Sequence, residues 1–263
     1  MPANHPDLPV QHFRGRDGVQ LAYREVGEGR LLVLIHGFVS TGYVNWVKYG
    51  HAALLAGAGY RVVMPDLRGH GDSARPHDAA AYPPDVITDD AFALLDHLGL
   101  AADADFDLGG YSLGGRTTVR MLVRGCRPAR AVVAGMGLDN ITSTGRSTGW
   151  FRHLLTSYGT FEHADPEFMA QAFLKTVGGD PQALLRVLET SVDTPEGQIA
   201  KVEVPTLVLM GEQDADHGSA ADLAALLPHG TCRSVPGSHM GAVAQPQLGQ
   251  AIADWLGPAD ARG

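Results

Sequence analysis

Short apolar runs of strand length alternate with helical patterns along most of this chain. The strand-like runs are residues 31–35, 61–64, 105–109, 130–134, 204–210 and 231–235. Strands that are apolar on both faces and joined through helices pair in parallel, and helices cover the resulting sheet. The pattern therefore predicts an α/β fold with a mostly parallel central sheet and helices on both faces.

The first residues predict an antiparallel start to that sheet. Residues 10–13 and 19–26 have strand character and flank Arg16-Asp17-Gly18, a sequence typical of a hairpin turn. After Asp85, a candidate N-cap, apolar residues recur at helical spacing as far as Gly99. Glycine there is expected to end the helix, because it adopts the left-handed conformation that a helix end often needs.

The alternation stops between residues 139 and 197, where helical segments follow one another without a strand. Asp165-Pro166 and Asp180-Pro181 each predict a helix start, because aspartate can cap a helix and proline fits its first position. Gly178 is expected to close the first of these two helices. We predict a core domain of residues 1–138 and 198–263 and a helical insertion of residues 139–197.

The candidate nucleophile lies in Gly110-Tyr111-Ser112-Leu113-Gly114-Gly115, between the apolar run 105–109 and a helical pattern at 116–123. A serine with this glycine spacing, between a strand and a helix, is typical of a nucleophile elbow. The serine there has a strained backbone, and its neighbours come too close for any residue but glycine. An ordinary glycine-rich loop has a similar composition, but the flanking elements favour a catalytic Ser112.

A nucleophilic serine needs a base, and the base needs an orienting carboxylate. Asp214 follows the fifth strand-like run and His239 follows the sixth. Loops past the carboxyl ends of parallel strands meet at one edge of the sheet, where α/β proteins bind their ligands. We therefore predict a triad of Ser112, Asp214 and His239. Two other carboxylates stay open as alternatives for the acid: Asp216 and Asp139.

Backbone amides are the usual donors to the oxyanion that forms in acyl transfer. The helix after Ser112 directs the amide of Leu113 toward one point, and the turn His36-Gly37-Phe38 offers the amide of Phe38. These two N–H groups are the candidate oxyanion hole. His36 itself is expected only to brace its loop through a backbone hydrogen bond.

Taken in order, these motifs resemble the α/β-hydrolase fold superfamily, in its esterase-like branch with a serine nucleophile. The matching stretches are His36-Gly37-Phe38, residues 65–73 (PDLRGHGDS), residues 110–115, Gly211-Glu212-Gln213-Asp214 and Gly237-Ser238-His239. The resemblance covers about residues 13–256. It implies that the insertion is a cap domain after the sixth strand. It also implies that Asp66, Arg68 and His70 brace a structural loop.

Two features of the elbow bear on the comparison with that superfamily. Asp107 and Gly109 depart from its pattern, in which the strand before the elbow is more apolar and bulky. The superfamily's epoxide hydrolases and haloalkane dehalogenases place aspartate at the elbow and form an alkyl-enzyme ester. Ser112 therefore argues against both of those activities.

We expect a serine hydrolase that cleaves a carboxylic ester through an acyl-enzyme on Ser112. A C–C bond hydrolase, a lactonase or an acyltransferase with the same triad stays open. So does a protein of another class, a non-catalytic small-molecule binding protein on the same fold. A small-molecule substrate is the expected partner.

The insertion is rich in apolar side chains: Trp150, Phe151, Leu154, Leu155, Tyr158, Phe161, Phe168 and Phe173. Most are expected to pack the insertion onto the core. A few should line the entrance above Ser112 and favour an apolar acyl or alcohol group.

Composition narrows the remaining classes. The 263 residues, 44% hydrophobic and 19% charged, suit one large folded α/β domain with an insertion. The formal net charge of −9 argues against nucleic acid or an anionic membrane surface as partner. No apolar run approaches the roughly 20 residues of a membrane span, and residues 1–6 lack the pattern of a signal peptide. We therefore expect a cytoplasmic location.

Cys126 and Cys232 are the only cysteines, and they are expected to be free thiols. The histidines show no paired ligand spacing, so no metal site is predicted, and ester hydrolysis needs no cofactor. Nothing in the pattern indicates an oligomeric state.

Overall fold

A computed structural model describes residues 8–100, 105–146 and 148–259. In this part of the chain eight strands form one sheet, in the order β1-β2-β4-β3-β5-β6-β7-β8. The strands are β1 (Gln11–Arg14), β2 (Gln20–Val26), β3 (Arg30–Ile35), β4 (Tyr60–Asp66), β5 (Asp107–Tyr111), β6 (Arg130–Ala134), β7 (Thr206–Gly211) and β8 (Gly230–Val235). β1 pairs with β2 and β2 with β4 in antiparallel fashion, and the other pairs are parallel. The predicted mostly parallel sheet with an opening hairpin is confirmed.

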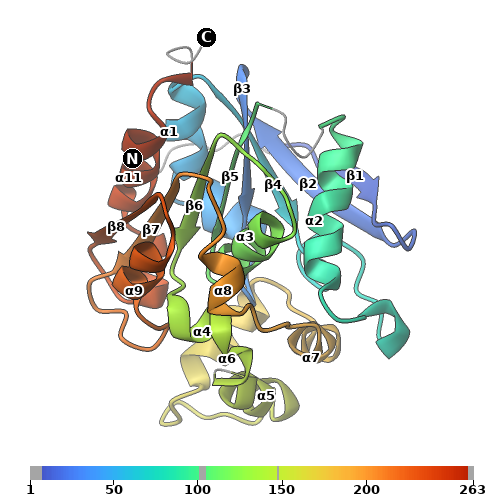
Figure 1. The fold of residues 1–263 in the computed structure, drawn as a ribbon. Helices are drawn as coiled ribbons and strands as arrows, with labels where there is room; N and C mark the ends of the chain where they lie inside the picture. The colour runs from blue at the N-terminus through green and yellow to red at the C-terminus, as the bar shows by residue number, and fades with distance from the viewer. Residues whose placement is uncertain (1–7, 101–104, 147, 260–263) are drawn as a thin grey trace.

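Helices cover both faces of the sheet (Figure 1). α1 (His51–Gly57) and α11 (Pro246–Leu256) share one face, and α2 (Val86–His97), α3 (Leu113–Val123) and α9 (Ala220–Leu226) lie on the other. Successive residues of β3 point to opposite faces. Leu32 and Leu34 join the apolar cluster of α1 and α11, whereas Val33 and Ile35 join that of α2. Because both faces are buried, the whole strand is apolar.

The helices between β6 and β7 gather at one end of the molecule (Figure 1). They are α4 (Leu138–Thr142), α5 (Thr148–Thr156), α6 (Phe168–Thr176), α7 (Pro181–Glu189) and α8 (Glu196–Ile199). Three of their side chains, Leu155, Leu174 and Leu184, form a small apolar cluster with Val39 from the turn after β3. The helical content of residues 139–197 agrees with expectation, and their status as a separate cap domain stays a prediction. The remaining short elements are the π-helical turn η1 (Tyr43–Val47), the 3₁₀ turns η2 (Ala79–Ala81) and η3 (Thr144–Arg146), and α10 (His239–Val243).

Several predicted boundaries need correction. β5 begins and ends two residues later than expected, because its ladder with β6 continues to Tyr111 opposite Ala134. The helix predicted at Asp165 begins instead at Phe168, and the Asp165 carboxylate accepts a hydrogen bond from the amide of Glu162. The start at Asp180-Pro181 is confirmed by bonds from two first-turn amides to the Asp180 carboxylate.

Asp85 holds the N-cap position of α2, but its carboxylate does not cap the helix. It accepts hydrogen bonds from Thr88 and Arg120 instead, which ties α2 to α3. The glycines expected at the ends of α2 and α6, Gly99 and Gly178, both have positive φ. A left-handed residue just past a helix is the geometry that favours glycine.

The two unusual residues of β5 are explained by their neighbours. Asp107 is fully buried, and its carboxylate accepts a hydrogen bond of 2.8 Å from Nε of Arg30 on β3. Gly109 allows close packing, since a Cβ there would lie 3.0 Å from Cβ of Val132. A buried ion pair and a close strand contact therefore replace the bulkier apolar packing.

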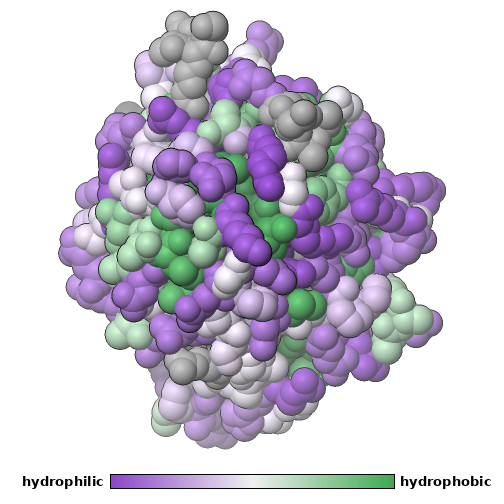
Figure 2. All heavy atoms as spheres, in the orientation of Figure 1, coloured by the Kyte–Doolittle hydropathy of each residue, from purple (hydrophilic) through white to green (hydrophobic). Residues whose placement is uncertain are grey.

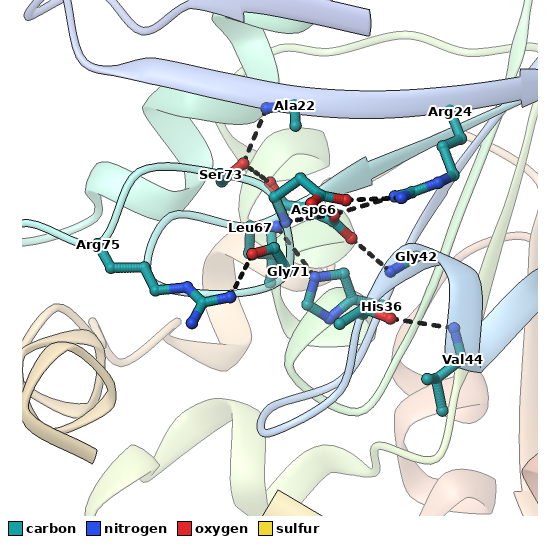
Figure 3. A network of polar contacts seen from close by, with 12 residues as sticks. Ala22, Arg24, His36, Gly42, Val44, Asp66, Leu67, Gly71, Ser73 and Arg75 are labelled. Carbon is teal, nitrogen blue, oxygen red and sulfur yellow. Dashed lines mark hydrogen bonds and ion pairs between the residues drawn. The ribbon is translucent and has the colours of Figure 1, made fainter. Parts of the chain in front are cut away.

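The loop after β4 is held by buried polar groups (Figure 3). The Asp66 carboxylate accepts hydrogen bonds from the amides of Gly42, at 2.8 Å, and Asp72, at 2.9 Å. Nε2 of His36 accepts a hydrogen bond of 2.9 Å from the amide of Leu67. Nδ1 of the same ring lies 2.7 Å from the carbonyl oxygen of Gly37. Burial lowers the pKa of His36 to about 4, so its ring is neutral and serves as the brace that was expected.

Arg68 joins three distant segments in the same region. Its side chain is 1% exposed and bonds to both carboxylate oxygens of Asp90 on α2 and of Asp17 in the hairpin turn. Burial raises the pKa of Asp90 to about 6 even though the guanidinium opposes that shift. These contacts fit the bracing role that the resemblance implied.

Hydrophilic side chains cover most of the face seen in Figure 2, with hydrophobic groups in separate patches. Within the described ranges, no helix combines the length and the apolar character that crossing a bilayer requires. Both cysteines are free, Cys126 buried and Cys232 exposed, as expected.

Replacing Arg68 with methionine should lower the free energy of unfolding by about 3–5 kcal/mol, because the buried Asp90 carboxylate would lose its counter-charge. Urea denaturation followed by circular dichroism measures this. Arg16→Met is the matched control: Arg16 pairs with Asp96 at the surface, and its loss should change the free energy by less than about 0.5 kcal/mol. Equal effects of the two variants would contradict the bracing role of Arg68.

Candidate active site

The turn from β5 into α3 depends on two glycines. A Cβ on Gly110 would lie 2.2 Å from the carbonyl carbon of Gly114, and a Cβ on Gly114 would lie 2.1 Å from the carbonyl oxygen of Ile35. Ser112 between them has φ 54° and ψ −113°, a conformation that costs a non-glycine residue about 1–3 kcal/mol. This is the strained strand–turn–helix geometry that the glycine spacing predicts.

The segments that follow β7 and β8 bring two further side chains to Ser112. Nε2 of His239 lies 3.0 Å from Oγ of Ser112, and Nδ1 of the same ring lies 2.7 Å from Oδ2 of Asp214. His239 was expected on a loop, but it is the first residue of α10, whose N-cap is Ser238. The three residues thus form one hydrogen-bonded chain, in which Asp214 and His239 both lie more than 100 residues after Ser112 in the sequence.

The alternative acids occupy other positions. The Asp139 carboxylate accepts a hydrogen bond from the amide of Ser219, and the Asp216 carbonyl accepts one from the side chain of Asn140. Among the described residues, the His239 ring bonds to no carboxylate but that of Asp214. The geometry therefore favours Asp214 as the partner of His239.

Burial and hydrogen bonding set the charges of this chain. Burial opposes ionisation of Asp214, but hydrogen bonds from His217 and His239 outweigh it and hold the pKa of that carboxyl below its usual value. Burial lowers the pKa of His239, the Asp214 carboxylate raises it, and the neighbouring His217 lowers it. The net shift is downward, so the ring is mostly neutral at pH 7 and can accept a proton.

His217 is a member of the site that sequence reasoning missed. Its Nδ1 lies 2.6 Å from Oδ1 of Asp214, and its ring stacks on that of His239 with centroids 3.5 Å apart and planes 10° apart. One carboxylate thus accepts a hydrogen bond from each of two stacked imidazoles. The only signal in the sequence is a histidine three residues after Asp214 in a short loop, which does not predict a stacked ring.

The three side chains Asp214, His217 and His239 also carry donor atoms within 4.8 Å of one another, a spacing that could hold a metal ion. In this arrangement both Nδ1 atoms already bond to the carboxylate, and hydrogen bonding alone accounts for it. The expected absence of a metal site stays a prediction.

Ser112 and His239 face a cavity of 930 Å³. Its wall is largely apolar and comes from both the core and residues 139–197, including Phe38, Val39, Tyr111, Trp150, Phe151, Leu154, Met169, Phe173, Met240 and Val243. Four side chains singled out from the sequence, Trp150, Phe151, Leu154 and Phe173, are among them. Leu155 is instead buried in the apolar cluster with Val39.

The candidate oxyanion donors lie beside the serine. Phe38, Ser112 and Leu113 together line a recess of 40 Å³ next to the main cavity. Within the described residues, neither the Phe38 amide nor the Leu113 amide has a hydrogen-bond acceptor. Both N–H groups are therefore available to a ligand, and their catalytic role stays a prediction.

Comparisons with known proteins agree with this architecture. A model of the alpha/beta hydrolase family matches residues 32–249. An epoxide hydrolase of Caballeronia sordidicola is 40% identical over 86 residues, which are 33% of this chain and only 25% of that protein's length.

Solved structures resemble nearly the whole chain. A hydrolase from Pseudomonas aeruginosa PA01 has a TM-score of 0.72 and 23% identity, covering 97% of this chain and 100% of its own. A thermophilic esterase from Thermogutta terrifontis has a TM-score of 0.70 and 21% identity, covering 94% and 98%. At these identities the likeness shows the fold.

Replacing His217 with alanine should raise the pKa of His239, because the second imidazole would no longer lower it and the remaining ring would gain water. Proton NMR titration of the His239 ring measures the pKa directly. His229→Ala is the control, since His229 is exposed and pairs with Glu203 at the surface. An unchanged His239 pKa in His217→Ala would show that the stacked ring does not influence the base.

Proposed function

The chain belongs to the α/β-hydrolase family, and on this premise we propose that it cleaves a carboxylic ester through an acyl-enzyme on Ser112. The observation that carries the proposal is the hydrogen-bonded chain from Ser112 Oγ through the His239 ring to Asp214. A neutral imidazole at 3.0 Å from a hydroxyl is placed to take its proton.

In the proposed mechanism, Ser112 Oγ attacks the ester carbonyl while His239 Nε2 takes its proton. The carbonyl oxygen becomes an oxyanion, and the amides of Phe38 and Leu113 donate hydrogen bonds to it; one such donor contributes about 2.7–4 kcal/mol. The intermediate collapses and releases the alcohol, which receives the proton from His239. Asp214 holds the imidazole in the required tautomer and stabilises its charged form.

The second half of the reaction repeats these steps with water. His239 takes a proton from the water that attacks the acyl carbonyl, and then returns a proton to Ser112 as the carboxylic acid leaves. The apolar wall of the 930 Å³ cavity supports a small-molecule substrate with an apolar acyl or alcohol group. The absence of a nucleic-acid partner remains part of the proposal because the formal net charge is −9. A cytoplasmic location is also part of the proposal.

Epoxide hydrolysis is the second candidate, because the curated relative named above is an epoxide hydrolase. The chemistry of Ser112 weighs against it. A serine oxygen that opens an epoxide forms an ether, which has no carbonyl for water to attack, so the enzyme would remain alkylated. A C–C bond hydrolase, a lactonase and an acyltransferase all retain an acyl intermediate and fit the same three residues.

Ser112→Ala should abolish turnover of short activated esters and labelling by a fluorophosphonate, because the attacking oxygen is removed. Alanine keeps the Cβ, so the melting temperature should change little. Retained ester turnover in the variant would refute the assignment of Ser112 as the nucleophile. Wild-type protein that folds but does not react with the fluorophosphonate would instead favour a binding protein.

A substrate panel separates the reaction classes. Wild-type protein should hydrolyse 4-nitrophenyl butyrate with a kcat/KM above those for styrene oxide, a vinylogous diketone and a γ-lactone, all measured at one pH. Fast cleavage of the diketone or the lactone together with negligible ester turnover would identify a C–C bond hydrolase or a lactonase in place of an esterase. Diol formation from styrene oxide that Ser112→Ala abolishes would overturn the argument against epoxides.

A further inference from the structure

Arg116 is a buried cation near Ser112. Among the described residues, no carboxylate forms a hydrogen bond or an ion pair with it. It lies in the first turn of α3, four residues after Ser112, and is 9% exposed. Its Nη1 donates a hydrogen bond of 3.2 Å to Oγ of Ser191, and its Nε has no acceptor among the described residues. Burial lowers the pKa of Arg116 to about 10, which still leaves it protonated at neutral pH.

Two other arginines with buried side chains have the carboxylate partners that Arg116 lacks among the described residues. Arg68 bonds to two carboxylates, and so does Arg30, which holds Asp105 and Asp107. Asp193 attracts Arg116 only through space, because its carboxylate accepts hydrogen bonds from the amide and hydroxyl of Thr144. A buried charge without a paired counter-charge is costly, so a ligand with the opposite charge would be favoured here.

Arg116 and Ser191, which accepts its hydrogen bond, both line the 40 Å³ recess beside the main cavity. Phe38, Ser112, Phe151 and His217 line both spaces, so the recess and the large cavity meet at the nucleophile. A water molecule needs roughly 10–15 Å³ of such space, so the recess has room for a group of a few heavy atoms. A carboxylate has that size, and its two oxygens suit the planar donors of an arginine.

We propose that this recess binds a carboxylate of the substrate against Arg116, so that the substrate is an ester with one short anionic arm and one apolar arm. The apolar arm occupies the 930 Å³ cavity, and the scissile carbonyl lies between the two at Ser112. The inference rests on the proposed esterase function for the position of the carbonyl. The binding of the carboxylate itself does not depend on turnover.

Two sets of matched esters, one for the acyl side and one for the alcohol side, test the proposal and locate the anionic arm. For the acyl side, the 4-nitrophenyl monoesters of succinic, glutaric and adipic acid are compared with the 4-nitrophenyl esters of butyric, valeric and hexanoic acid. For the alcohol side, the butyrate ester of 4-hydroxybenzoate is compared with phenyl butyrate. In at least one matched pair the wild type should prefer the anionic ester by about 10-fold to 100-fold in kcat/KM, as a hydrogen-bonded charge pair implies.

Arg116→Met should reduce that preference to about one. Arg124→Met is the matched control, because Arg124 follows the same helix but pairs with Asp85 and Asp89 away from the site. It should keep the wild-type preference. If the wild type shows no preference in any of the matched pairs, or if Arg116→Met shows the same preference as the wild type, the inference is overturned while the esterase proposal stays intact.

A measurement without turnover keeps the two proposals separable. Glutarate should raise the melting temperature of the wild type, whereas the neutral pentane-1,5-diol should not, and Arg116→Met should lose the glutarate effect. If no ester is turned over but glutarate still stabilises the wild type, the esterase proposal fails and the carboxylate site stands. If glutarate has no effect on the wild type, the carboxylate site fails, whether or not the methionine variant folds.

Discussion

The close approach of the elbow to the end of β3 is the constraint on which the rest of the site depends. Gly114 lies so near the carbonyl of Ile35 that a Cβ would lie 2.1 Å from its oxygen. Glycine at this position permits the contact, and with it the sharp turn that leaves Ser112 with positive φ and starts α3 directly behind it. Because the helix begins there, its first amide and, one turn later, Arg116 both face the space around the serine.

A second constraint is electrostatic and centres on one carboxylate. Asp214 is almost fully buried, and its two oxygens are taken by two imidazoles, His217 and His239. A buried carboxylate is tolerated when hydrogen bonds satisfy it, and here those bonds also orient the ring that faces Ser112. The second imidazole distinguishes this site from a simple row of three residues, because it restrains the base from one face and shifts its pKa downward.

The two spaces next to Ser112 have different linings. The large cavity is walled by apolar side chains from the core and from residues 139–197, whereas the small recess contains the buried guanidinium of Arg116. The proposed ester with one apolar and one anionic arm rests on this division, in which an apolar cavity and a buried arginine without a bonded carboxylate among the described residues both adjoin Ser112. The formal net charge of −9 does not predict this, since it sums all ionisable residues and does not depend on where each one lies.

Local features of the sequence determined the order of strands and helices, the glycine turn at Ser112 and the capped start at Asp180, because each depends on neighbouring residues alone. The β5 boundary and the start of α6 were wrong, since ladder pairing and a competing turn at Asp165 decided them. Only the tertiary structure brought His239 to Ser112, paired its ring with Asp214 and not Asp216, and stacked His217 on it. It also left Arg116 without a bonded carboxylate among the described residues. The contacts of His239 with Ser112, Asp214 and His217 join separate segments of the chain, and no spacing within one segment encodes them.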